Sequence, residues 1–331
     1  MRELIRTNNP VLVSAVGALL DGAGIPHTVL DQHMSVLEGS LGILPRRILV
    51  DDDDHDEARR LLQDAGLAHE LRPVPGESAS DTTDDAILGG RLRLKQQKRG
   101  HRVGHDAILL AAATGARPGD HVVDLGAGVG AAGLALAARV GETTVTLVER
   151  DPALAALARE NADRNDMAGR VQVAELDVAD PREAFAAAGL AGGTIDWVMM
   201  NPPFNDPAQT NASPDPARRA AHTASPVDLP DWIAAAAWLL HSAGSLVLIW
   251  RADGLADVLS ALPPQFGGIA LVPVHGRPGQ PAIRVVARAS KGSRAPLSIF
   301  PALMLNGADG RPTMEIERVL RDAEPLPFAA T

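Results

Sequence analysis

Between residues 121 and 250 the sequence alternates short apolar runs with amphipathic segments of helical length. The apolar runs are HVVDL, TVTLVE, VQVAELD, IDWVMM and SLVLIW. Strands that alternate with helices predict βαβ units in an open parallel sheet whose two faces are covered. The runs 269–274 and 283–289 are joined by a loop without a helix, which predicts an antiparallel hairpin at one edge. We therefore expect an α/β, Rossmann-like sheet of seven strands.

The N-terminal region follows another pattern. Residues 1–72 contain three short β-like runs and two helical segments in the order βαββα, which is typical of a small α+β, ferredoxin-like domain. Residues 73–86, PVPGESASDTTDDA, contain Pro, Gly, Ser, Thr and Asp and hardly any large apolar residue, so we predict a linker there. The second domain then covers residues 87–331.

Composition excludes several classes of protein. The chain has 331 residues and no cysteine, so disulfides and thiolate metal sites are excluded. Its 10 histidines show no metal-ligand spacing. Its apolar runs fall short of the roughly 18 residues that a spanning helix needs, and its N-terminus lacks the apolar core of a signal peptide. We expect a cytoplasmic protein without a metal ion or a membrane partner.

The net charge of -10 is unevenly distributed along the chain. Residues 1–90 carry 7 basic and 16 acidic side chains, whereas residues 91–331 carry 24 basic and 25 acidic ones. Basic residues cluster at 91–102 and at 277–294, with no acidic residue among them. Such clusters favour contact with phosphate groups, and we assign them to an RNA substrate. The candidate substrate-binding residues are Arg102, Arg284, Lys291 and Arg294.

A glycine-rich turn follows the first strand of the second domain, and each of its first three strands ends in or near an acidic residue. Gly126, Gly128 and Gly130 let the backbone approach a ligand at the start of the next helix. They overlap a GxGxxG motif, so a dinucleotide is one alternative. An acid beside the loop suits a cationic group better than a pyrophosphate, which favours S-adenosylmethionine. The acids and their expected partners are Asp124 for the amino-acid part, Glu149 for the ribose and Asp177 for the adenine amine.

The fourth strand ends in Asn201-Pro202-Pro203-Phe204. Asn201 is held extended because it precedes proline, and the prolines lack N–H donors. The Asn201 side-chain oxygen and the Pro202 carbonyl can each accept an N–H of a conjugated amine, which directs its lone pair at a sulfonium methyl. Phe204 offers a flat face for stacking a base. We predict Asn201, Pro202 and Phe204 as catalytic residues, with Asn201 also facing the cofactor.

Residues 88–322 resemble the class I S-adenosylmethionine-dependent methyltransferases, and within them the bacterial tRNA1(Val) adenine-N6 methyltransferase-like family. The resemblance is carried by VGHDAILLAAA, VVDLGAGVGAAGLALAARV, LVERDPALAALARENADRN, MNPPFND and ARASKGSRAPL. It implies that Asp106 holds the methionine end of the cofactor and that the acceptor is adenine N6 in a tRNA loop. Residues 1–70 resemble a prokaryotic signal-transducing protein family through LDQHMSVLEGSLGILPRRILV, and no activity follows from that resemblance.

Two alternatives share this sequence evidence. The same chemistry suits guanine N2 of ribosomal RNA, a protein glutamine amide or a small aromatic amine as the acceptor. A protein of another class would bind S-adenosylmethionine as a sensor and report through its N-terminal domain. Residues 205–230 are rich in small, polar and proline residues, and we expect them to order over the acceptor as a lid. The sequence does not determine the oligomeric state.

Overall fold

The computed structural model describes residues 2–7, 10–30, 46–65, 67, 82–98, 103–203 and 228–330. The chain divides into two compact units, Met1–Asp81 and Thr82–Thr331, and each unit is described by itself. Within the described ranges, no helix is both long enough and apolar enough to cross a membrane.

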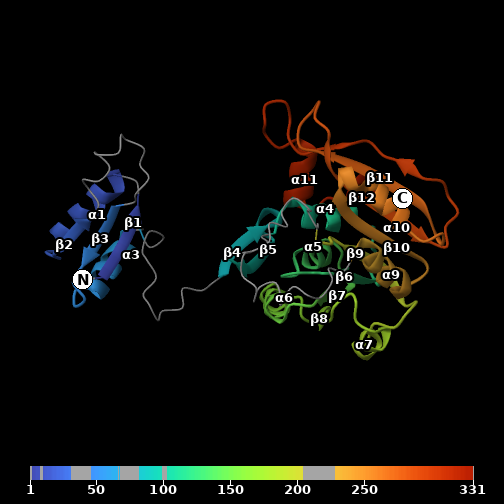
Figure 1. The fold of residues 1–331 in the computed structure, drawn as a ribbon, viewed down its shortest axis with the longest axis horizontal. Helices are drawn as coiled ribbons and strands as arrows, with labels where there is room; N and C mark the ends of the chain where they lie inside the picture. Colours follow the sequence, from blue (N-terminus) through green and yellow to red (C-terminus); the bar gives the residue numbers. More distant parts are fainter. Residues whose placement is uncertain are drawn as a thin grey trace, which may run out of the picture. The chain divides into compact units, whose positions relative to one another are not determined.

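The first unit is a small α+β domain (Figure 1). Its elements are β1 (Arg2–Thr7), α1 (Pro10–Gly22), β2 (His27–Leu30), β3 (Arg46–Val50) and α3 (His55–Asp64). The strands lie in the order β1-β3-β2, and both pairings are antiparallel. Leu4, Val16, Ile48 and Leu62 belong to its buried core, so one face of the sheet packs against both helices. The predicted α+β class is confirmed, and the elements that the structure describes follow the predicted order.

The second unit contains a larger sheet that is mostly parallel. Its parallel strands are β6 (His121–Leu125), β7 (Thr144–Glu149), β8 (Val171–Glu175), β9 (Ile195–Met200) and β10 (Leu240–Arg251), in the spatial order β10-β9-β6-β7-β8. The antiparallel hairpin of β11 (Phe266–His275) and β12 (Ala282–Lys291) joins the sheet at β10. The Rossmann-like sheet with an antiparallel edge hairpin is therefore confirmed. We call the edge where the parallel strands end the carboxyl edge.

The expected count of seven strands is corrected by two short additions. β13 (Ser298–Ile299) and β14 (Leu303–Met304) pair with β11, and the larger sheet has nine strands among the described residues. Each addition has only two residues. A segment this short shows no alternating pattern, so its strand conformation depends on the β11 edge beside it rather than on its own sequence.

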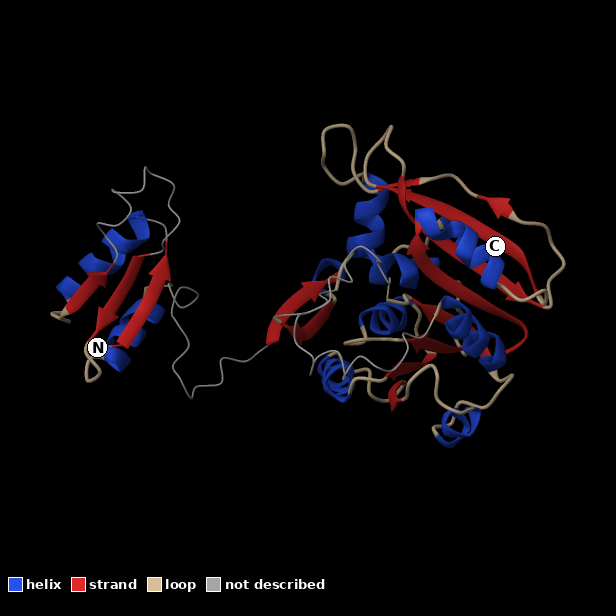
Figure 2. Ribbon diagram, in the orientation of Figure 1, coloured by secondary structure: helices blue, strands red, loops and turns tan. Residues whose placement is uncertain are grey.

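Helices cover both faces of the larger sheet (Figure 2). One buried cluster joins the sheet to α4 (His105–Ala113), α5 (Ala131–Arg139), α6 (Pro152–Arg164) and α11 (Met314–Asp322). The other joins the opposite face to α7 (Arg182–Ala187), α9 (Leu229–Leu239) and α10 (Leu255–Ala261). Because both faces are covered, the strands are buried on both sides, which explains why their sequences are continuous apolar runs rather than alternating ones.

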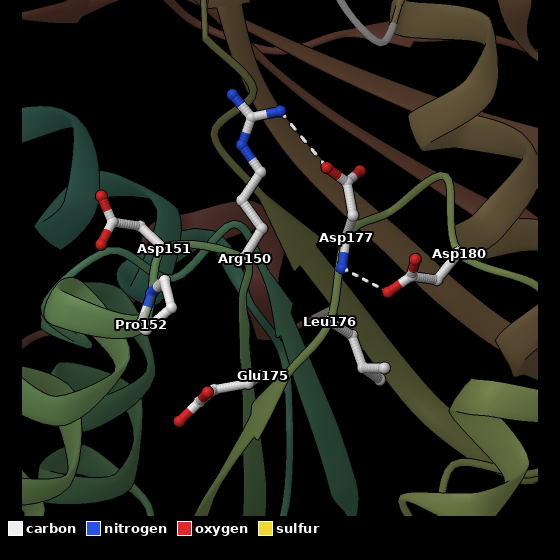
Figure 3. Close-up of a pocket in the computed structure, with 7 residues that line it drawn as sticks. All are labelled: Arg150, Asp151, Pro152, Glu175, Leu176, Asp177 and Asp180. Atoms are coloured by element: carbon white, nitrogen blue, oxygen red, sulfur yellow. Dashed lines mark hydrogen bonds and ion pairs between the residues drawn. The ribbon is translucent and has the colours of Figure 1, made fainter. Parts of the chain in front are cut away.

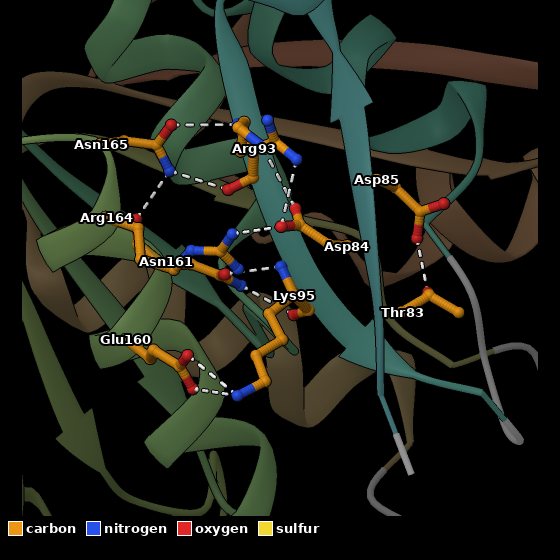
Figure 4. Close-up of polar contacts among 9 residues, drawn as sticks. All are labelled: Thr83, Asp84, Asp85, Arg93, Lys95, Glu160, Asn161, Arg164 and Asn165. Atoms are coloured by element: carbon orange, nitrogen blue, oxygen red, sulfur yellow. Dashed lines mark hydrogen bonds and ion pairs between the residues drawn. The ribbon is translucent and has the colours of Figure 1, made fainter. Parts of the chain in front are cut away.

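A separate antiparallel hairpin precedes this sheet and corrects the predicted linker. It consists of β4 (Thr82–Ile87) and β5 (Leu92–Gln97), so residues 82–86 form a strand instead of the end of a linker. Their sequence, TTDDA, is polar because polar contacts hold the hairpin against α6 (Figure 4). Asp84 binds Arg93 and Arg164, and the Lys95 ammonium lies 2.9 Å from Glu160. The basic side chains of β5 are therefore used within the domain.

Candidate active site

The glycine loop, residues 126–130, connects β6 to α5 at the carboxyl edge. Gly126, Gly128 and Gly130 have φ values of 72°, 58° and 87°, in a region that residues with a side chain rarely adopt. A Cβ atom at Gly126 would lie 2.5 Å from the Trp232 ring, and one at Gly130 would lie 2.8 Å from Leu147. At Gly128 a Cβ atom would meet nothing within 4 Å. The loop is thus packed against the protein at both ends and open at its middle.

Glu149, the last residue of β7, supports this loop. Its Oε2 accepts the N–H of Gly128 at 2.8 Å, and its Oε1 accepts the N–H of Asp151 at 2.8 Å. A carboxylate has about four lone-pair sites, so two backbone bonds leave it capacity for further donors. Glu149, which was predicted to bind ribose, is therefore hydrogen-bonded directly to the predicted cofactor loop.

Asp124 lies in a different environment from the one that we expected. It is 2% exposed, and its Oδ2 accepts the N–H of Gly133 in α5 at 2.9 Å. Burial raises the pKa of Asp124 to about 7, the bond from Gly133 lowers it, and the charge of Glu149 raises it further. Both faces of the sheet are covered, so this side chain points into the core. Asp124 therefore orients α5 behind the glycine loop, and its predicted contact with the cofactor stays a prediction.

A pocket of about 510 Å³ lies between the ends of β7 and β8 (Figure 3). Its volume falls within the roughly 300 to 1,000 Å³ typical of small-molecule sites. Arg150 Nη1 lies 3.3 Å from Asp177 Oδ2, and Asp177 Oδ1 accepts the N–H of Ala179. These contacts orient the Asp177 carboxylate beside the pocket. The lining residues are Arg150, Asp151, Pro152, Glu175, Leu176, Asp177 and Asp180.

Asn201 follows β9 at the level where the glycine loop follows β6. Leu125 pairs with Met200, so Gly126 and Asn201 leave adjacent strands roughly 5 Å apart. The Asn201 Oδ1 is buried, and it has no hydrogen-bond partner within the part of the chain that the structure describes. Buried polar atoms are rarely left unpaired, so this oxygen is suited to accept a donor from a ligand. Phe204 and residues 205–227 of the predicted lid lie outside the described residues.

Asp106, in the first turn of α4, forms an ion pair with Arg284 on β12. Arg284 Nε donates to Asp106 Oδ2 at 2.9 Å, and the two side chains are about a third exposed or less. Arg284 pairs in register with Arg251, the last residue of β10, which places the ion pair at the carboxyl edge. A residue predicted to bind the cofactor and one predicted to bind the substrate thus contact each other.

The structure separates the other predicted substrate-binding residues from this site. Lys291 lies at the far end of β12, where its Nζ donates to the carbonyl oxygens of Ala237 and Leu240 at the end of α9. The strand between Arg284 and Lys291 spans about 23 Å. Arg294 is exposed beyond that same end, and Arg102 lies outside the described residues. Residues 284–294 do not form one basic surface, because the two ends of a strand lie at opposite edges of the sheet.

Two residues at this edge were not predicted from the sequence. Arg150 orients Asp177, and the ring of Trp232 packs against Gly126. Arg150 directly follows Glu149, so the reasoning about strand ends that selected Glu149 could have included it. Trp232 had no such signal, because its contact joins segments that are far apart in the chain.

Comparison with family models divides the chain in the same way as the fold. The model described as "Putative prokaryotic signal transducing protein" matches residues 1–66. The model described as "Methyltransferase small domain" matches residues 102–272, which is more than half of the chain.

Individual relatives agree with the second match. A curated tRNA1(Val) (adenine(37)-N6)-methyltransferase from Porphyromonas gingivalis is 33% identical over 162 residues, which are 47% of this chain and 61% of the relative. A protein of the same name from Photorhabdus laumondii is 27% identical over 233 residues, which are 67% of this chain and 87% of the relative. The matches to two curated relatives span about three fifths of the length of those proteins.

One solved structure extends the comparison to the fold. The crystal structure of a predicted O-methyltransferase from Agrobacterium tumefaciens is 32% identical, and the match covers 66% of this chain and 97% of that chain with a TM-score of 0.56. The sheet order, the glycine loop at its carboxyl edge and the family model all agree with this likeness. The chain belongs to the methyltransferase small domain family.

Proposed function

We propose that the protein transfers a methyl group from S-adenosylmethionine to the exocyclic amine of a nucleic-acid base, adenine N6 in a tRNA. The observation that carries this proposal is the buried Asn201 Oδ1, which lies beside the glycine loop and has no hydrogen-bond partner among the described residues. The names of the curated relatives specify adenine N6 of a tRNA as their acceptor, which supports the choice of base.

The residues at the carboxyl edge fit S-adenosylmethionine. Gly128 leaves the loop open to a ligand, Glu149 retains acceptor capacity for ribose hydroxyls, and Asp177 lies beside a pocket of about 510 Å³ that suits an adenine ring. Asp106 offers a carboxylate for the α-ammonium group. When bound, S-adenosylmethionine supplies a methyl group on a positively charged sulfur.

Asn201 and Pro202 act on the acceptor rather than on the cofactor. A conjugated amine is a poor nucleophile because its lone pair is delocalised into the ring. If the Asn201 Oδ1 accepts one N–H and the Pro202 carbonyl oxygen accepts the other, electron density stays on the nitrogen and its lone pair is directed at the methyl group. The methylated nitrogen then loses a proton without a strong base. Two adjacent acceptors suit an amine, which has two N–H bonds, better than a hydroxyl, which has one O–H.

The acceptor must present its base outside the helical stack. An amine of a stacked and paired base is out of reach of Asn201, whereas a base in a loop is already unpaired or can be flipped at a cost of a few kcal/mol. A tRNA loop meets this requirement. Since tRNA is a cytoplasmic molecule, we place the proposed reaction in the cytoplasm.

The test is transfer of radiolabelled methyl groups to total tRNA, followed by mass spectrometry of the nucleosides. We expect label in tRNA as N6-methyladenosine, and roughly 10²-fold to 10³-fold slower labelling with Asn201→Ala. A labelled N2-methylguanosine would overturn the choice of base, and label in protein alone would overturn the RNA substrate. Binding of the cofactor without transfer to any pool would instead support a sensor.

A further inference from the structure

Opposite charges from two distant segments meet at the carboxyl edge. Asp106 comes from α4 and Arg284 from β12, and Arg284 Nε lies 2.9 Å from Asp106 Oδ2. The Arg284 Nη1 donates to the carbonyl oxygen of Ile283 at 3.1 Å. The Asp106 side chain is 27% exposed and that of Arg284 is 30% exposed. Because most of each side chain is buried, the ion pair holds a defined geometry, and the exposed part of each side chain is accessible to a ligand.

The direction of α4 explains why Asp106 reaches this edge. A Cβ atom at Gly115, just after α4, would lie 3.0 Å from the ring of Trp197 near the start of β9. The helix therefore ends at the opposite edge of the sheet and begins at the carboxyl edge. Its first turn, which contains Asp106, therefore lies beside Arg284 at the carboxyl edge. The N–H groups of that turn and the Arg284 guanidinium can both interact with an anion there.

The register of the strands gives the distance between the ion pair and Asn201. Met200 pairs with Leu248, and Leu248 pairs with Ala287, so Arg284 lies two residues beyond the level of Asn201 and two strands across. These steps amount to about 7 Å along the strands and about 10 Å across them, or about 12 Å in all. The amino-acid chain, with two methylene groups between its sulfur and its α-carbon, bridges part of that distance, and the long Arg284 side chain covers the rest.

We propose that Asp106 and Arg284 together bind the zwitterionic amino-acid end of the cofactor, with Asp106 accepting from the α-ammonium group and Arg284 donating to the α-carboxylate. This inference rests on the proposed function, because it requires S-adenosylmethionine as the ligand. It assigns Arg284 to the cofactor, whereas the sequence had placed it among residues that contact RNA phosphates.

The chemistry of the two side chains suits this ligand. A guanidinium is planar, carries five N–H donors and matches a carboxylate in a two-point contact. A zwitterion presents one charge of each sign, and Asp106 and Arg284 present the complementary signs in the same place. Without the ligand the two side chains neutralise each other, so neither is left as an isolated, partly buried charge. With the ligand each gains a second partner of opposite charge.

Two other roles for Arg284 make different predictions. If the ion pair only holds α4 against β12, its loss should weaken every ligand of the site to the same extent. If Arg284 binds an RNA phosphate, its loss should raise the KM for tRNA and leave cofactor binding unchanged. If Arg284 binds the amino-acid end of the cofactor, its loss should weaken the binding of ligands that contain the amino acid and leave the binding of other ligands unchanged.

The test measures dissociation constants by calorimetry for S-adenosylhomocysteine, which contains the amino acid, and for 5′-methylthioadenosine, which does not. For Arg284→Met in the full chain we expect S-adenosylhomocysteine to bind about tenfold more weakly or worse, since a bond between charged groups is lost. We expect 5′-methylthioadenosine to bind as it does to the unchanged protein. Arg284→Lys keeps the charge without the fork, so it should fold and give an intermediate loss.

Arg251→Met is the matched control. Arg251 pairs directly with Arg284 in the sheet, has a similar exposure of 33% and forms its own ion pair with Asp253, so its loss should change neither constant. Equal weakening of both ligands by the Arg284 variants, or weakening of neither, would overturn the inference. If the unchanged protein binds neither ligand, the proposed function itself fails, which separates the two failures.

Discussion

Leu125 and Met200 are paired across β6 and β9, so the glycine loop and Asn201 leave the sheet at neighbouring positions. The order of the strands reverses at this point, because β7 and β8 continue on one side of β6 while β9 and β10 lie on the other. Among the described helices, α5 after β6 and α9 after β9 belong to opposite faces, which is the arrangement of the topological switch points where open α/β sheets bind ligands. The pairing of β6 with β9 therefore places the proposed cofactor loop beside Asn201, whose side-chain oxygen is proposed to accept a hydrogen bond from the amine.

Asn201→Ala should reduce methyl transfer roughly 10²-fold to 10³-fold, the usual effect of removing one hydrogen-bonding group that acts on the reacting atoms. The affinity for S-adenosylhomocysteine should change little, because the side-chain oxygen binds the acceptor. Single-turnover transfer and calorimetry measure the two quantities. Asn306→Ala is the control. The Asn306 side chain donates to the carbonyl oxygen of Gly276 in another loop, so this variant should retain transfer. Equal loss of transfer and of cofactor affinity would contradict the assignment.

Gly126→Ala should destabilise the second unit more than Gly128→Ala. Both positions have positive φ, so each substitution costs about 1 to 2 kcal/mol for a left-handed residue. Only the new Cβ at residue 126 also meets the Trp232 ring, at 2.5 Å. Urea unfolding followed by circular dichroism gives both free energies. Gly126→Ala should destabilise the second unit less in a Trp232→Leu background than in the unchanged protein. If the two substitutions instead change the free energy of unfolding additively, the side chains at 126 and 232 do not interact.

Asp124→Asn should make the stability of the second unit less dependent on pH. The folded state raises the pKa of Asp124 to about 7, above the value of about 4 in an unfolded chain. The stability contributed by the protonated form is complete below pH 4 and is lost as pH rises through 7, by up to about 4 kcal/mol. The unchanged protein should therefore lose stability relative to the variant between pH 5 and pH 8.

Tryptophan fluorescence during urea unfolding at these two pH values measures this difference. All four tryptophans, residues 197, 232, 238 and 250, lie in the second unit, so the signal reports on that unit alone. A difference in stability between the two proteins that stays constant with pH would show that Asp124 does not titrate in this range.

Asp84→Asn should loosen the hairpin of β4 and β5. The hydrogen bonds from Arg164 and Arg93 lower the pKa of Asp84, so their contribution is present above pH 4 and is lost as pH falls through the lowered pKa. Hydrogen exchange of residues 82–97 should be faster in the variant at neutral pH, and the two proteins should converge in acid. Asp163→Asn, at an exposed position of α6, should leave the exchange unchanged. Unaltered protection in Asp84→Asn would contradict this role.

Local sequence patterns determined most of the fold. Buried parallel strands are continuous apolar runs, so the bounds of β6, β7 and β9 agree with the runs in the sequence. The glycines at 126 and 130 were identifiable because a left-handed turn against packed side chains admits no Cβ. The β4 strand was missed because it is stabilised by charges on β5 and α6, and the two-residue strands were missed because they depend on a neighbouring edge.

The sequence by itself determined that a glycine loop, three acids near strand ends and an asparagine before two prolines follow successive strands, because local propensity and periodicity are properties of neighbouring residues. The tertiary structure alone decided which side chains meet. In the folded protein the Asp124 side chain lies in the core, and Asp106 contacts Arg284. Lys291 contacts the end of α9, far from Arg284. Those outcomes depend on helix direction and strand register, which are set by packing between segments far apart in the chain.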